Sequence, residues 1–293
     1  MTLLHVSPLH RTRIKICGIT REEDVDAAVA AGADAVGFVL YEPSARYVSA
    51  ERAAELASRL PPFVTPVLLF VNASAPEIIA ACARLPTALL QFHGDETPED
   101  CLQYGRAFLR AARIPLDGLW APTLSALQAS GDSPPLSEER AQFPLNRPDG
   151  ESPVAPQTFD LVKYIHDFKQ AQAILLDAHV EGFGGGGKTF NWSLLPPSVS
   201  AHLVLSGGLT PANVTDGILQ VRPRCKTLAV DVSSGVEISK GIKSLEKINQ
   251  FVAAVRAADE HFVNLAGQTR LHEPSEWAAL SPTDQHHVRL PAT

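Results

Sequence analysis

The chain has 293 residues, 45% of them hydrophobic, and a formal net charge of −7. This length allows one or two domains, and an α/β barrel commonly takes about 250 residues as a single domain. The acidic balance, without any basic block, argues against nucleic acid as a partner. No apolar run is long enough to span a membrane, so we expect no membrane partner.

Four cysteines stand at Cys17, Cys82, Cys101 and Cys225, with no C-x-x-C spacing and no histidine pair at a ligand spacing beside them. This pattern argues against a zinc site and a disulfide framework, and it fits a reducing compartment. Residues 1–12 lack the apolar core of a signal peptide. We therefore expect a cytoplasmic protein with no bound metal.

A strand followed by a helix recurs along the chain. The expected strands cover residues 13–17, 35–40, 64–71, 88–93, 107–114, 173–178, 202–206 and 228–233. The expected helices cover residues 21–31 and 50–60, begin near Ser74, Pro98 and Pro211, and cover residues 159–170 and 243–258. The strands are short and mostly apolar, as strands are when helices cover a parallel sheet.

Several residues are typical of helix ends. Thr20 with Glu23 and Ser74 with Glu77 each match the capping box of a helix start, and Ser49 is a candidate N-cap. Pro98 suits the first turn of a helix, where its missing N–H costs nothing. Gly32 suits the residue just past a helix end. These signals predict that each helix begins soon after a strand ends.

Residues 115–157 interrupt the repeat, since they are rich in Pro, Ser and Gly and show no sustained period apart from a short helical pattern near 124–130. We interpret this segment as an irregular insertion. The expected organisation is an N-terminal arm over residues 1–12, one domain over residues 13–258 that contains the insertion, and a tail over residues 259–293.

Eight strand–helix units predict a single parallel (β/α)8 TIM barrel. The active sites of such barrels lie at the C-terminal ends of the strands. Residues able to carry chemistry or bind a ligand follow these strand ends: Cys17, Arg46, Gln91, His93, Asp177, Gly207, Gly208, Asp231, Ser233 and Ser234. This coincidence predicts one site at the mouth of the barrel.

Cys17 ends the first strand, where alternation puts it on one face with Lys15 and puts Ile14 and Ile16 on the other. A lone cysteine in an apolar strand is usually an inert, buried residue. Asp177 ends the sixth strand, and taken alone it fits a helix cap as well as a catalyst. The first and sixth strands are three apart in a closed ring, so the two side chains are expected to face each other across the mouth.

Two glycine-rich loops, residues 206–211 and 231–235, follow the last two strands. Glycines let backbone N–H groups approach an anion, and the serines add hydroxyl donors. Loops after the seventh and eighth strands are the usual phosphate site of these barrels. The two loops together predict a phosphorylated ligand, although each alone fits an ordinary turn.

Residues 182–189 formally match a Walker A motif, which raises the alternative of a nucleotide hydrolase. A P-loop leads directly into a helix, whereas Pro196 and Pro197 end any helix here within two turns. A flexible lid over the barrel mouth, with Gly184, Gly185, Gly186, Gly187 and Lys188, fits the segment better. A noncatalytic phosphate-binding barrel is a further alternative, which the pairing of Cys17 with Asp177 disfavours.

The motifs resemble those of the phosphoribosylanthranilate isomerases of tryptophan biosynthesis. The matching motifs are KICGIT at 15–20, GADAVGF at 32–38, SARYVS at 44–49, QFHG at 91–94, LLD at 175–177, GGGGKTF at 184–190, LSGGL at 205–209 and VDVSSGVE at 230–237. They occur in family order, from about residue 13 to residue 258. The departures are few: Glu42, Ala45 and Asn191 stand where the family usually has Lys, Pro and Asp.

The resemblance implies an enzyme without cofactor that performs an Amadori rearrangement. N-(5-phosphoribosyl)anthranilate would become 1-(2-carboxyphenylamino)-1-deoxyribulose 5-phosphate. Asp177 would be the general acid, Cys17 the general base, and Arg46 a contact to the anthranilate part. Gly207, Gly208, Ser233 and Ser234 would bind the phosphate. The related barrel of histidine biosynthesis is expected to have a carboxylate where this chain has Cys17.

Chemistry sets a demand on Cys17. A free thiol has a pKa of about 8.5, so a cysteine base needs a modestly stabilised thiolate.

We expect a small phosphoribosyl substrate as the ligand, and a monomer rather than a dimer.

Overall fold

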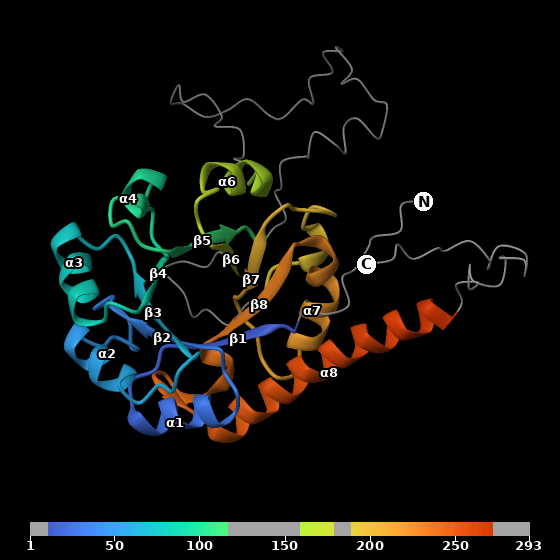
Figure 1. Ribbon diagram of the computed structural model, residues 1–293, viewed down its shortest axis with the longest axis horizontal. Helices are drawn as coiled ribbons and strands as arrows, with labels where there is room; N and C mark the ends of the chain where they lie inside the picture. The colour runs from blue at the N-terminus through green and yellow to red at the C-terminus, as the bar shows by residue number, and fades with distance from the viewer. Residues whose placement is uncertain (1–10, 117–158, 179–188, 272–293) are drawn as a thin grey trace, which may run out of the picture.

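The computed structural model describes residues 11–116, 159–178 and 189–271, with side chains up to residue 265 (Figure 1). Eight parallel strands form a closed barrel in the order in which they occur along the chain. They are β1 Arg13–Cys17, β2 Ala35–Val39, β3 Thr65–Phe70, β4 Leu89–Phe92, β5 Phe108–Ile114, β6 Ala173–Ala178, β7 His202–Leu205 and β8 Thr227–Val232. The predicted (β/α)8 TIM barrel is confirmed.

Helices follow the strands and lie outside the barrel (Figure 1). They are α1 Glu22–Ala30, α2 Ala50–Ala57, α3 Ala75–Arg84, α4 Pro98–Leu102, α6 Leu161–Asp167, α7 Val214–Val221 and α8 Leu245–Leu271, with 3-10 turns Trp192–Leu194, Arg222–Arg224 and Ser234–Val236. Among the described residues, no helix is long and apolar enough to cross a membrane.

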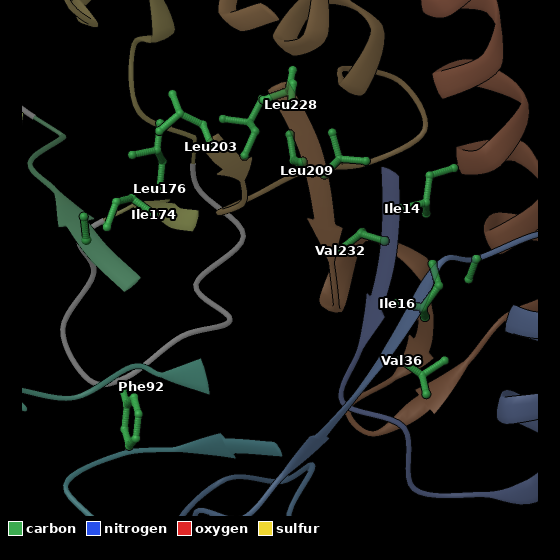
Figure 2. Packing of buried hydrophobic residues seen from close by; sticks show 14 of the residues in the cluster. Ile14, Ile16, Val36, Phe92, Ile174, Leu176, Leu203, Leu209, Leu228 and Val232 are labelled. Carbon is green, nitrogen blue, oxygen red and sulfur yellow. The ribbon is translucent and has the colours of Figure 1, made fainter. Parts of the chain in front are cut away.

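The strands divide their side chains between two environments. Ile14, Ile16 and Val36 belong to the large apolar cluster between strands and helices (Figure 2). Cys17 instead packs with Val39, Leu69 and Val71 in a separate small cluster. The predicted alternation along β1 is confirmed, and it places Lys15 and Cys17 on the interior face of the barrel.

The helix-end predictions had mixed outcomes. The capping box of Ser74 and Glu77 is confirmed, and so are Ser49 as an N-cap and Pro98 in a first turn. The capping box of Thr20 and Glu23 is wrong, because α1 begins at Glu22 without a side-chain cap. The Thr20 hydroxyl donates instead to the Gly241 carbonyl, 2.7 Å away, so a long-range contact replaces the local one.

Most element boundaries shift by one to three residues, but the last helix differs more. The sequence predicted a helix over residues 243–258, whereas α8 continues to Leu271. A small antiparallel pair, β9 Glu237–Ser239 and β10 Ile242–Lys243, precedes it and was not predicted. Most of the predicted insertion, the lid glycines at 184–187, Lys188, the arm up to residue 10 and the tail beyond residue 271 lie outside the described residues.

Candidate active site

A pocket lies at the C-terminal ends of the strands, where the sequence predicted the site. Its lining includes nine of the ten predicted residues from the strand ends: Cys17, Arg46, His93, Asp177, Gly207, Gly208, Asp231, Ser233 and Ser234. Gln91 is fully buried and contacts His93 instead. The walls also include apolar side chains from β2 and β3, such as Val39 and Leu69.

Cys17 forms one side of the pocket at the end of β1, with 4% of its surface exposed. Burial raises the pKa of the Cys17 thiol, and the positive charge of Lys15 opposes this effect. Asp231 raises the same pKa, while a hydrogen bond from Lys15 and the charge of Lys243 lower it. Burial outweighs the neighbouring cations, so the net effect of these surroundings is to raise the pKa of the Cys17 thiol.

Lys15 is a buried cation that the sequence reasoning placed on the correct face but did not assign to the site. Its ammonium lies 2.8 Å from an oxygen of Asp231, and both side chains are buried. The pairing follows from the barrel, because Lys15 and Asp231 are register partners on β1 and β8. Although burial opposes it, the Asp231 carboxylate holds the pKa of Lys15 above its usual value.

Asp177 forms the opposite side of the pocket at the end of β6. Its Oδ2 lies 2.9 Å from Nε2 of His93, whose Nδ1 lies 3.1 Å from the amide nitrogen of Gln91. An amide nitrogen only donates, so Nδ1 accepts and the neutral imidazole donates from Nε2 to Asp177. Gln91 and His93 were predicted to bind substrate; in the structure His93 lines the pocket and contacts Asp177, and Gln91 contacts His93.

The two predicted phosphate loops meet beside the pocket. Gly207 and Gly208 have φ angles of 75° and 65°, a backbone conformation that glycine adopts without strain. A Cβ on Gly235 would lie 1.9 Å from the Leu209 carbonyl oxygen, so the loop after β8 packs directly on the loop after β7. These glycines shape a polar rim suited to an anion.

Arg46 reaches the pocket from the loop after β2. It makes a bidentate ion pair with Glu237, at 2.7 and 2.8 Å, through Nε and one terminal nitrogen. Glu237 also accepts from Lys243 at 2.8 Å. Although burial opposes it, hydrogen bonding from Arg46 and the charge of Lys243 hold the pKa of Glu237 below its usual value.

Three charged residues around the pocket were not predicted from the sequence: Lys15, Glu237 and Lys243. For Lys15 a signal was available, because a lysine on the interior face of a barrel strand needs a buried counter-charge. No comparable signal marked Lys243, since it lies in the short strand β10 that the sequence pattern did not reveal. Within the described part of the chain, no group of three or more His, Cys, Asp or Glu residues could hold a metal ion.

Fold and site together define a class: a (β/α)8-barrel enzyme with a cysteine and an aspartate in one pocket and two glycine-rich loops beside them. The family model of N-(5'-phosphoribosyl)anthranilate (PRA) isomerase matches residues 14–114 and 124–254. The chain therefore belongs to the N-(5'-phosphoribosyl)anthranilate isomerase family. The matched residues include 124–157 of the segment that we predicted to be an insertion.

Similar proteins agree with this assignment. An N-(5'-phosphoribosyl)anthranilate isomerase from Methylibium petroleiphilum is 53% identical over 249 residues, which are 85% of this chain and 96% of the relative. The phosphoribosyl anthranilate isomerase structure from Thermotoga maritima is 34% identical with a TM-score of 0.62, over 84% of this chain and 99% of that one. The Thermotoga enzyme is described as dimeric.

One solved neighbour contains a ligand. It is a phosphoribosyl anthranilate isomerase in complex with reduced 1-(o-carboxyphenylamino)-1-deoxyribulose 5-phosphate, 31% identical with a TM-score of 0.57, over 84% of this chain and 99% of that one. The predicted family and activity are confirmed: the protein is an isomerase of tryptophan biosynthesis. This outcome decides against the nucleotide hydrolase and the noncatalytic barrel.

Proposed function

We propose that Cys17 and Asp177 are the base and the acid of the Amadori rearrangement of N-(5-phosphoribosyl)anthranilate. The observation that carries this proposal is that both side chains line one pocket, together with the loops that follow β7 and β8. In a closed barrel these two strands separate β6 from β1. A sugar phosphate held by the loops would thus have the carboxyl on one side and the thiol on the other.

In this mechanism, Asp177 gives its proton to the ribose ring oxygen as the C1′–O bond breaks, which produces an open-chain Schiff base. The Cys17 thiolate then takes the proton from C2′, and the electrons of that bond neutralise the iminium to give an enolamine. Tautomerisation of the enol gives the ketone product. The rearrangement as a whole needs no external electron acceptor. Each proton transfer of this kind typically accelerates the reaction by about 10²–10⁴-fold.

The surrounding residues bind the substrate and orient the catalytic side chains. Backbone N–H groups of Gly207 and Gly208, with Ser233 and Ser234, bind the phosphate. Arg46 binds the anthranilate carboxylate: Glu237 occupies its Nε and one terminal nitrogen, and the second terminal nitrogen is available to the substrate. His93 and Gln91 orient Asp177, and Asp231, which lines the pocket, stays a proposed substrate contact. Residues 184–188 remain our proposal for the lid.

The proposed reaction is tested by generating the anthranilate substrate in situ and following its fluorescence with purified protein. We expect substrate consumption that requires the protein and no added metal or cofactor. If the substrate persists, the proposal fails.

We also propose a monomeric, cytoplasmic protein. The four cysteines are all free thiols, which suits a reducing compartment. Multi-angle light scattering at the mass of one chain would support the monomer, and twice that mass would contradict it.

The division into an arm over residues 1–12, a barrel over 13–258 with an insertion at 115–157, and a tail over 259–293 also stays our proposal. Deleting residues 119–152 should leave turnover largely intact. A collapse of turnover in the folded deletion variant would show that this segment helps to form the site.

A further inference from the structure

The interior of the barrel beneath Cys17 contains a buried ion pair that the mechanism above does not use. Lys15 stands two residues before Cys17 on β1, so both side chains point to the same interior face. A Cβ placed on Gly37 of β2 would lie 2.7 Å from the Cys17 sulfur and 2.9 Å from the Lys15 ammonium nitrogen. The two atoms therefore border the same small space.

Gly37 is what permits this arrangement. It is the register partner of Cys17 on the neighbouring strand, and any side chain there would occupy the space that the thiol and the ammonium share. The other side of Lys15 is bound by Asp231, whose second oxygen accepts from the Ser206 hydroxyl at 3.3 Å. Strands β1, β2 and β8 thus hold the ammonium beside the sulfur.

We propose that Lys15 is a positioning residue for the reaction: its ammonium, held in place by Asp231, stabilises the Cys17 thiolate that removes the substrate proton. This proposal rests on the assignment of Cys17 as the base. Asp231 fixes the location of the cation and keeps it charged inside the barrel, although its own negative charge disfavours the thiolate.

The charges near the sulfur come from four elements. Lys15 lies on β1, Asp231 on β8, Lys243 on β10, and Arg46 in the loop after β2. Lys15 has the largest electrostatic effect of these on the Cys17 thiol, larger than that of Asp231. Asp177 and His93 line the far side of the same pocket. Removing Lys15 should therefore raise the pKa of the thiol further, because the remaining cations offset less of the effect of burial.

The test measures the reactivity of the thiol itself, independently of turnover. Cys17 alkylation by iodoacetamide is followed between pH 6 and 9 by mass spectrometry of its tryptic peptide. A single opposite charge within about 4–6 Å shifts a pKa by about 1–3 units. Lys15→Met should therefore slow alkylation at pH 7 by about 10- to 1,000-fold. Lys163→Met, which removes an exposed ammonium paired with Asp167, should leave the rate unchanged.

A second variant guards against misfolding, because Lys15→Met leaves Asp231 buried without a partner. The double variant Lys15→Met/Asp231→Asn removes both charges. Its alkylation rate should lie between those of the wild type and the single variant, since the anion that disfavours the thiolate is also gone. If Lys15 only joined β1 to β8, both variants would loosen the pocket and alkylation would become faster, which would overturn the proposal.

Kinetics then separate this proposal from the assignment of Cys17. If both hold, the acid limb of kcat/KM moves to higher pH in Lys15→Met by the same shift as the alkylation profile. Slower alkylation without movement of that limb would keep Lys15 as the residue that stabilises the thiolate and would reject Cys17 as the base. An unchanged alkylation profile would reject the role of Lys15 whatever the kinetics show.

Discussion

The two sides of the pocket hold their reactive groups by different means. On the side of β1 and β8, Cys17 lies beside a buried ion pair, Lys15 with Asp231. On the side of β4 and β6, Asp177 accepts from a neutral imidazole that in turn accepts from the amide of Gln91. A thiolate needs a nearby cation, whereas a carboxyl that gives up a proton is better oriented by a neutral donor, because a full positive charge would favour the carboxylate.

The largest expected effect comes from removing either reactive group. Cys17→Ser and Asp177→Asn should each lower kcat by about 10²–10⁴-fold, since each removes one proton transfer. Both variants nearly keep the shape of the native side chain, so the unfolding midpoint in urea should change little. A variant that keeps near-normal turnover would show that its side of the pocket is not catalytic.

The charged side of the pocket extends to Glu237, which bridges Arg46 and Lys243. Glu237→Gln should lower the free energy of unfolding by about 3 kcal/mol at pH 7, because it leaves the buried Lys243 and the half-buried Arg46 without their counter-charge. The pKa of Glu237 is lowered in the folded protein, so its stabilisation is complete above the unfolded value of about 4.3 and is lost as pH falls through the folded value.

Urea titrations at pH 7, 5 and 3.5 check this pH dependence. The difference between wild type and Glu237→Gln should begin to shrink at the lowest pH, which lies below the unfolded value of about 4.3. Glu22→Gln is the matched control, because Glu22 makes a similar bidentate pair with Arg52 at a more exposed position. Its effect should be small at every pH. If both variants lost the same free energy of unfolding, burial of the Glu237 ion pair would not explain its contribution to stability.

A glycine on each side tests how rigidly the two groups are held. A Cβ on Gly207 would lie 2.5 Å from the backbone nitrogen of Ala178 and 2.8 Å from Oδ1 of Asp177, and its φ of 75° strains any other residue. Gly207→Ala should cost about 1–3 kcal/mol of stability. The three atoms nearest to a Cβ on Gly37 are side-chain atoms of Cys17 and Lys15, which can move.

Gly37→Ala should therefore cost less stability than Gly207→Ala, while it still lowers kcat by displacing the thiol. Urea unfolding and turnover of the two variants decide the matter. A Gly37→Ala protein that is less stable than the Gly207→Ala protein would contradict the expectation that the side chains around Gly37 can move to accept a methyl group.

The smallest effect is expected for the neutral side. His93→Asn removes the donor to Asp177 and should lower kcat about tenfold, or about 1.4 kcal/mol, with little change in KM. Gln91→Leu acts one contact further away and should have a smaller effect. A loss in His93→Asn as large as that in Asp177→Asn would mean that the imidazole itself takes part in proton transfer.

The sequence alone determined the barrel, the ten residues at its strand ends and the family. It could do so because strand–helix repeats and glycine loops are local patterns, and because parallel strands bring their ends together. It gave the correct faces for Lys15 and Cys17 by alternation alone.

Tertiary structure decided how those residues are paired. The partners Lys15 with Asp231 and Arg46 with Glu237 are separated by 216 and 191 positions in the chain, so no local pattern reveals them. Thr20 was predicted to cap a helix and instead bonds to Gly241. The pKa of the Cys17 thiol depends on burial and on several charges from different strands. These groups come together only when the barrel closes, so the sequence alone does not predict the direction of the shift.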